Sequence, residues 1–255
     1  MVWNKTLQRG NIHKIDIGFW NTYYSLLQLG HKVYFYDTAS APDKSLTDIV
    51  DSFKPDLLYC CMTGDTSLTP YEPWEEIQKE TEKGRCKTFN WFCDDTWRFD
   101  SFSSKVCKFF HVCSTVEVDY LEKFKEIGYD NIIHSMWHTN LDFYPKVSTK
   151  DIDISFCGIP NFERQSLTNA LTREGLSVDY RYGVSHEDMC ELFSRSKISL
   201  NFSKNMTLTP PRRQIKARLF EVPAGKAVLC TEKTPNLEEY YIPDKEVIIY
   251  EGATE

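Results

Sequence analysis

The sequence has no apolar run that approaches the roughly 20 residues of a membrane-spanning helix. It also has no basic segment followed by an apolar stretch near its start, which is the pattern of a secretory signal peptide. We therefore expect neither a membrane span nor a signal peptide.

Positive charge is in the minority. The chain contains 30 lysine and arginine residues against 37 aspartate and glutamate residues, so its net charge is −7 and its pI is near 5.5. A partner held by bulk electrostatics, such as nucleic acid or an anionic membrane surface, needs the opposite balance. We expect no such partner, although a local basic pocket is indicated around Arg212.

Paired cysteine motifs are absent. The nine cysteines include no C-x-x-C pair, and their number is odd. Most lie within or beside strand-like apolar runs: Cys60, Cys61, Cys93, Cys113, Cys157 and Cys230. Because disulfides persist in oxidising compartments and free cysteine behaves as a small buried apolar residue, the pattern favours reduced thiols in a cytoplasmic protein.

The chain does contain an alternation of strand-like runs and helical patterns along its 255 residues. KTFNWFC (87–93) follows a charged helical pattern over 75–83, and the same order recurs in the second half, for example before KISLNFS (197–203). Repeated strand, helix and strand imply a parallel sheet covered by helices. A polar stretch over 144–153 separates two such series, which predicts domains at 1–146 and 151–255.

The predicted fold class is therefore α/β, with two Rossmann-like parallel-sheet domains that face a central cleft. In such domains, ligands meet loops and helix N-termini at the carboxyl ends of the strands. The fold alone does not determine the function, so the evidence for function must come from the residues of the loops.

The most informative segment is PPRRQIKARLFEVPAGKAVLC (210–230), which predicts a helix over 214–222. Arg212, Arg213, Lys216 and Arg218 gather at its start, where cations oppose the helix dipole. An anion such as a diphosphate would offset that cost. The alternative is a surface helix with an ion pair between Arg218 and Glu221.

The run from Lys216 to Glu251 resembles the C-terminal domain of GT-B glycosyltransferases, particularly the group that includes the spore maturation protein CgeB. KISLNFS, DISFCGIPNFERQSL and FNWFCDDTWRFD also resemble segments of that group. The resemblance covers about residues 19–251 and is most specific over 218–250.

The resemblance implies roles for residues of a nucleotide-sugar donor site. Glu221 would accept hydrogen bonds from the ribose, and Arg218 and Lys216 would hold the diphosphate. The remaining donor-side residues are Gly158, Arg164 and Arg212 near phosphate, Tyr182 and Gly183 near the base, and Asn201 and Ser203 near the sugar.

Two features depart from the family pattern. Retaining GT-B enzymes often carry E-x7-E, but the position eight residues before Glu221 is Arg213, which disfavours retaining chemistry of that type. GT-B proteins also continue into helices that cross back onto the N-domain, whereas this sequence stops after the last expected strand, so we expect those helices to be missing.

FNWFCDDTWRFD (89–100) places Asp94 and Asp95 directly after an expected strand. Three readings are open: a metal site, a general base with a structural partner, or a pair that caps the turn. Metal binding is disfavoured because the diphosphate already has a cationic pocket. As a base, one carboxylate would deprotonate an acceptor hydroxyl, as inverting transfer requires.

His138 is the remaining candidate for the sugar or acceptor side. A neutral imidazole can act as a base or bind a hydroxyl. A single histidine beside Trp137 can equally be a packed residue.

We therefore expect a hexosyl- or pentosyltransferase that moves a sugar from a nucleoside-diphosphate donor to a hydroxyl of a glycan, protein or small molecule. No metal or other cofactor is expected. Two alternatives are open: a non-catalytic nucleotide- or sugar-binding protein on a degenerate fold, and a nucleotide-sugar epimerase.

Overall fold

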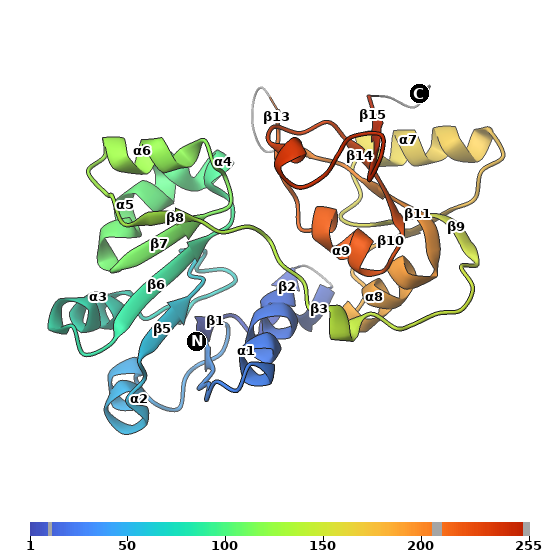
Figure 1. Ribbon diagram of the computed structural model, residues 1–255. Coiled ribbons are helices and arrows are strands. Elements are labelled where there is room, and N and C mark those ends of the chain that lie inside the picture. The colour runs from blue at the N-terminus through green and yellow to red at the C-terminus, as the bar shows by residue number, and fades with distance from the viewer. Residues whose placement is uncertain (10–11, 206–210, 252–255) are drawn as a thin grey trace. The chain divides into compact units, whose positions relative to one another are not determined.

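The computed structural model describes residues 1–9, 12–205 and 211–251 (Figure 1). The chain divides into two compact units, Met1–Met136 and Trp137–Glu255. The division falls earlier than the predicted boundary at 146 because the intervening segment packs on the second unit. There, the ring of Phe143 meets His186 edge-on, with 5.5 Å between the ring centroids, and Tyr144 is buried.

The first unit contains a six-stranded parallel sheet in the order β4-β1-β5-β6-β7-β8. Its strands are β1 (Val2–Trp3), β4 (Tyr36–Asp37), β5 (Leu57–Cys60), β6 (Lys87–Phe92), β7 (Val112–Thr115) and β8 (Ile132–His134). A separate antiparallel hairpin, β2 (Thr6–Arg9) with β3 (Ile12–Ile15), follows β1.

Helical segments connect the parallel strands of the first unit, as right-handed crossovers require. They are η1 (Phe19–Tyr23), α1 (Tyr24–Gln28), α2 (Leu46–Phe53), α3 (Trp74–Lys83), α4 (Asp95–Arg98), η2 (Phe99–Ser103), α5 (Ser104–Val106), η3 (Cys107–Phe109) and α6 (Tyr120–Glu126). Their apolar faces bury one core with the strands. In it, Phe92 of β6 stacks on Phe124 of α6 with 5.8 Å between centroids.

Two apolar runs of the first unit, over 31–37 and 108–114, form strands shorter than the runs themselves. In 31–37 only Tyr36–Asp37 is a strand, because the neighbouring β1 offers only two residues for pairing. In 108–114 the strand begins at Val112, after the short helix η3. Phe109 and Phe110 instead pack edge-on against Trp74, and a short apolar run does not distinguish these outcomes.

The second unit contains a five-stranded parallel sheet in the order β10-β9-β11-β14-β15. Its strands are β9 (Ile152–Cys157), β10 (Val178–Arg181), β11 (Ser196–Asn201), β14 (Val228–Glu232) and β15 (Ile248–Tyr250), and a small antiparallel pair is formed by β12 (Lys204–Asn205) and β13 (Arg212–Arg213). Its helices are η4 (Leu141–Phe143), α7 (Phe162–Arg173), α8 (His186–Arg195), α9 (Arg218–Ala224) and η5 (Leu237–Glu239).

Side-chain caps begin several helices. Ser45 accepts a hydrogen bond from the Asp48 amide at the start of α2. Ser185 does the same for Asp188 at the start of α8, and its hydroxyl donates to the Asp188 carboxylate at 2.8 Å. The Ser45 and Ser185 hydroxyl oxygens thus satisfy helix-start amides that have no partner inside the helix.

The helix predicted over 214–222 is displaced. Helix α9 begins at Arg218, and Arg212–Arg213 form β13 instead of a helical turn. The Gln214 amide donates to the Ser203 carbonyl at 3.0 Å, so this residue continues the pairing with the segment after β11. The basic residues are therefore divided between a hairpin and a helix start.

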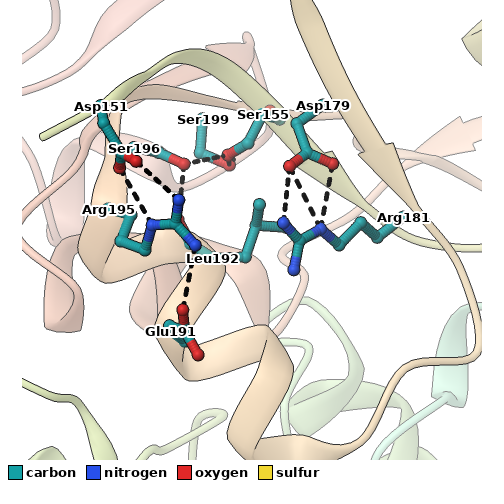
Figure 2. Close-up of polar contacts among 9 residues, drawn as sticks. All are labelled: Asp151, Ser155, Asp179, Arg181, Glu191, Leu192, Arg195, Ser196 and Ser199. Carbon is teal, nitrogen blue, oxygen red and sulfur yellow. Dashed lines mark hydrogen bonds and ion pairs between the residues drawn. The ribbon is translucent and has the colours of Figure 1, made fainter.

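Polar contacts fix the end of α8, β9 and β11 relative to one another (Figure 2). Arg195, at the end of α8, pairs with Asp151 at 2.6 Å and with Glu191 at 3.0 Å. The buried hydroxyl of Ser155 lies 2.7 Å from that of Ser196 and 3.0 Å from that of Ser199. These hydroxyls satisfy one another inside the sheet, where an unpaired polar group would be costly.

All nine cysteines are free thiols. Within the described residues, no helix combines the length and the apolar character needed to cross a membrane.

Candidate functional site

Two arginines converge at the carboxyl end of β9. Arg164 comes from α7 and Arg218 from α9, and their guanidinium carbons lie 5.5 Å and 5.3 Å from the ring centroid of Phe156. The buried Phe156 ring offers both cations the negative face of its π-system. Burial, and next the positive charge of Arg218, lower the pKa of Arg164. Two like charges held this close form a site that an anion would stabilise.

Backbone carbonyls orient each guanidinium. Arg164 Nη1 donates to the Ile159 carbonyl at 2.6 Å, and Arg218 Nη1 donates to the Cys157 carbonyl at 3.0 Å. The Nε atoms of both arginines are buried and donate to no residue that the structure describes. A guanidinium carries five N–H donors, so each arginine keeps donors for a ligand with several acceptor oxygens.

Gly158 allows this close packing. A Cβ added at Gly158 would lie 2.7 Å from Phe156 Cζ and 3.3 Å from Arg218 Nη1, so a side chain would displace the ring or the guanidinium. The Gly158 amide donates to the Arg181 carbonyl at 3.0 Å. Gly158 therefore lets the loop after β9 lie close to the arginines, and its own N–H group is hydrogen-bonded to the end of β10.

Glu221 lies one turn after Arg218 on α9 and is buried. Burial raises the pKa of the Tyr144 phenol, and the negative charge of Glu221 raises it further. Burial also raises the pKa of the Cys190 thiol to about 12, and the Glu221 charge contributes to this rise. The carboxylate is therefore close to both groups. Its predicted contact with a ribose stays a prediction.

Asn201 ends β11 and Ser203 lies two residues after it, and both side chains are buried and hydrogen-bonded to neighbours. Asn201 Nδ2 donates to Thr231 Oγ1 at 2.9 Å, and Ser203 Oγ donates to Glu232 Oε2 at 2.8 Å. These contacts hold the edge of the sheet. Tyr182, in contrast, is exposed just after β10, and the following Gly183 has φ of +71°, a backbone conformation that favours glycine.

The structure gives the other basic residues different positions. Arg212 lies in β13, opposite Asn205 of β12. Lys216 lies between β13 and α9 and is half-buried. Of the predicted donor-side residues, Arg164, Arg218 and Gly158 are the ones that the contacts bring together directly.

The two adjacent aspartates of the first unit differ sharply. Asp95 is 1% exposed, and neither of its carboxylate oxygens has a well-formed hydrogen bond to a described residue. The nearby hydroxyls of Ser103 and Thr115 favour its ionised form, but burial dominates and raises the pKa of Asp95 to about 6. This carboxylate therefore points into the core.

Asp94 is half-buried and precedes α4, so it lies at the surface of the strand end. The Cys93 thiol contacts its carboxylate at 3.9 Å. His138 is half-buried and belongs to the second unit, whereas both aspartates belong to the first. Their catalytic roles stay predictions, and burial makes Asp94 the better candidate of the pair.

Sequence reasoning missed three residues that complete the basic edge of the second unit. Phe156 supplies the ring under both arginines, Tyr180 places a buried phenol near them, and Glu232 accepts the hydrogen bonds at the end of β11. Strand position was the available signal, because all three lie on strands whose carboxyl ends meet at one edge.

Comparisons with known proteins give a partial family match and a match in fold. Residues 143–255 match a family model described as glycosyl transferase-like. The chain resembles the solved structure of Anabaena Alr3699/HepE in complex with UDP and glucose, with 10% identity and a TM-score of 0.55 over 91% of this chain and 75% of that chain. It also resembles the same protein in complex with UDP-glucose, with 10% identity and a TM-score of 0.56 over 98% of this chain and 84% of that chain.

A search of curated proteins found no match. At 10% identity, the structural likeness establishes the fold and no more. The two parallel sheets, in the first and the second unit, confirm the predicted α/β fold class of the GT-B type.

Proposed function

We propose that this protein transfers a sugar from a nucleoside-diphosphate donor to an acceptor hydroxyl. The observation that carries the proposal is the Arg164–Arg218 pair above Phe156. It lies at the carboxyl end of a parallel sheet, which is where α/β domains bind nucleotides. The match of residues 143–255 to a glycosyl transferase-like family, and the UDP-glucose bound to the similar HepE structure, support it.

The arginines would act on the leaving group. In sugar transfer from such a donor, the bond between the anomeric carbon and the diphosphate oxygen breaks, and the diphosphate gains negative charge in the transition state. Fixed cations aimed at that developing charge lower the barrier, because they need no reorganisation during the reaction. The Ile159 and Cys157 carbonyls fix the guanidinium planes in advance.

No metal is required by this proposal. A divalent ion in other transferases neutralises the diphosphate, and two arginines can supply an equivalent charge. Glu221 is proposed as the ribose contact and the exposed Tyr182 as the base contact. Asp94 is proposed as the base that accepts the proton of the acceptor hydroxyl.

Calorimetry with UDP-, GDP- and dTDP-sugars tests the donor site. We expect at least one to bind, and we expect Arg218→Met to weaken that binding by about ten- to a hundredfold, the loss of a charged hydrogen-bond partner. Arg173→Met is the matched control, because Arg173 is exposed at the far end of α7. The absence of binding to all three classes by folded protein would refute the donor site.

Product analysis by NMR then separates the chemistries. A transferase consumes donor only when an acceptor hydroxyl is present and releases a nucleoside diphosphate. An epimerase converts the donor without an acceptor, and a binding protein leaves it unchanged.

A further inference from the structure

A buried glutamate lies at the end of β14, beside the basic edge described above. Glu232 is 4% exposed, and its Oε2 atom accepts three hydrogen bonds. The donors are the Ser203 amide at 2.6 Å, the Ser203 hydroxyl at 2.8 Å and the Lys204 amide at 3.2 Å. Hydrogen bonds to an ionised acceptor are about twice as strong as neutral ones. Glu232 therefore holds the turn between β11 and β12 tightly.

The same carboxylate reaches the opposite strand of the hairpin. Its Oε1 atom lies 3.9 Å from Arg213 Nη2, and Arg213 pairs with Lys204 across the two strands. Glu232 thus contacts both strands at the base of what we call the basic hairpin, which comprises β12 (Lys204–Asn205) and β13 (Arg212–Arg213). The Asn205 and Gln214 side chains are also hydrogen-bonded, at 3.1 Å.

A second contact places the basic hairpin next to the arginine pair. Lys204 Nζ forms an ion pair with Glu163 in the first turn of α7. Glu163 immediately precedes Arg164, whose guanidinium stacks on Phe156 together with Arg218. The hairpin cations and the arginine pair therefore line the same edge of the sheet.

A negative charge at this edge is unexpected on electrostatic grounds. If the site binds a diphosphate, a nearby carboxylate repels it, and its removal should strengthen binding. The contacts of Glu232 suggest the opposite effect, since losing them frees the strands that carry Lys204, Arg212 and Arg213. The two effects have different signs, so an experiment can separate them.

We propose that Glu232 is a positioning residue that holds the basic hairpin against the arginine pair, so that the hairpin cations help to bind the donor diphosphate. This proposal rests on the proposed function. Glu232 itself does not touch the ligand. It acts through Ser203, Lys204 and Arg213.

The test measures binding of UDP and of inorganic pyrophosphate to Glu232→Gln by calorimetry. We expect both to bind about tenfold more weakly than to the original protein. Glu232→Asp, which keeps the charge, should recover part of the loss. Glu238→Gln is the matched control and should leave the affinities for UDP and pyrophosphate unchanged. The Glu238 carboxylate is exposed and lies 4.0 Å from Lys233, in the segment after β14.

Hydrogen exchange supplies a readout without ligand. The Ser203 and Lys204 amides should exchange faster in Glu232→Gln, while α7 amides keep their rates. If Glu232→Gln does not fold, Ser203→Ala serves instead, because it removes only the hydroxyl contact and should weaken pyrophosphate binding to a smaller degree.

Unchanged or tighter binding by folded Glu232→Gln would overturn the positioning role. If pyrophosphate binding depends on Glu232 but no nucleotide sugar binds, the proposed function fails and the positioning of an anion site is supported. If the original protein binds neither pyrophosphate nor UDP, both proposals are overturned.

Discussion

The two sheets have the same parallel construction, but different charged side chains stand out at their carboxyl edges. In the first unit, Asp37 at the end of β4 accepts amide hydrogen bonds from Lys5 and Ala39, and Asp94 follows β6. In the second unit, Arg164 and Arg218 meet at the end of β9. Architecture therefore repeats along the chain while the chemistry of the ligand edge changes.

The net charge of −7 conceals this division. Local fields decide where an anion binds, and a basic cluster on an acidic protein attracts anionic ligands to one place. Under the proposed function, the diphosphate would bind to the second unit, and a carboxylate of the first unit would act on the neutral acceptor hydroxyl. Four predictions test the comparison, in order of decreasing effect.

Asp94→Asn should produce the largest effect, a fall in kcat of about 10²- to 10⁴-fold, because an amide cannot accept the acceptor proton. Donor affinity should stay within about twofold, because the basic edge is intact. Steady-state kinetics and calorimetry on the same preparation check this. Asp100→Asn, at an exposed carboxylate nearby, is the control, and equal activity of the two variants would contradict the base role.

Asp95→Asn should stabilise the protein at pH 7.5 by about 1–3 kcal/mol. Burial raises the folded-state pKa of Asp95 to about 6, roughly two units above that of an unfolded aspartate. Above pH 6 the buried charge therefore lowers stability, and this penalty disappears as the pH falls from about 6 to 4.

Urea unfolding at several pH values measures this penalty. The gain from Asp95→Asn should shrink on acidification, while Asp130→Asn, at an exposed position, should show no such trend. A gain that does not depend on pH would exclude burial of the charge as its cause.

Ser155→Ala should lower the free energy of unfolding by about 1 kcal/mol, because it removes the hydroxyl between Ser196 and Ser199 (Figure 2). UDP affinity should not change, since the framework of hydrogen-bonded serine hydroxyls lies within the sheet and not at its basic edge. Thermal unfolding and calorimetry check both statements. A marked loss of UDP affinity in the folded variant would show that the framework, and not the edge charge alone, determines binding.

A chelator should have the smallest effect. Because arginines supply the charge proposed to offset the diphosphate, UDP affinity in EDTA should equal that in buffer. If EDTA abolished UDP binding and magnesium or manganese restored it, the carboxylates of the first unit would again be candidate metal ligands.

Much of the fold was predictable because local signals were strong. A serine three residues before an acidic residue is a helix-start pattern, and Ser185 with Asp188 coincides with the start of α8, while KISLNFS overlaps β11 (Ser196–Asn201). Predictions were wrong where a short apolar or basic run was compatible with two different local structures. The segment 212–217 lies outside α9 because the amide of Gln214 pairs with the Ser203 carbonyl.

The sequence indicated a cationic cluster in the second unit but not all of the residues that form it. Arg218 was expected to hold an anion from its own segment, whereas Arg164 had only a family resemblance to suggest it. The Phe156 ring that joins them gave no local signal, since a strand phenylalanine is usually core.

By itself, the sequence determined the alternation of strands and helices, the helix caps and the presence of a basic segment in an acidic chain. Each of these depends on residues close together along the chain. Only the tertiary structure decided that Arg164 meets Arg218, because the partners come from helices that follow different strands. It also separated Asp94 from Asp95, since Asp94 has non-helical backbone angles (φ −140°, ψ 34°) before α4 and stays half-buried, whereas Asp95 begins the helix and is buried.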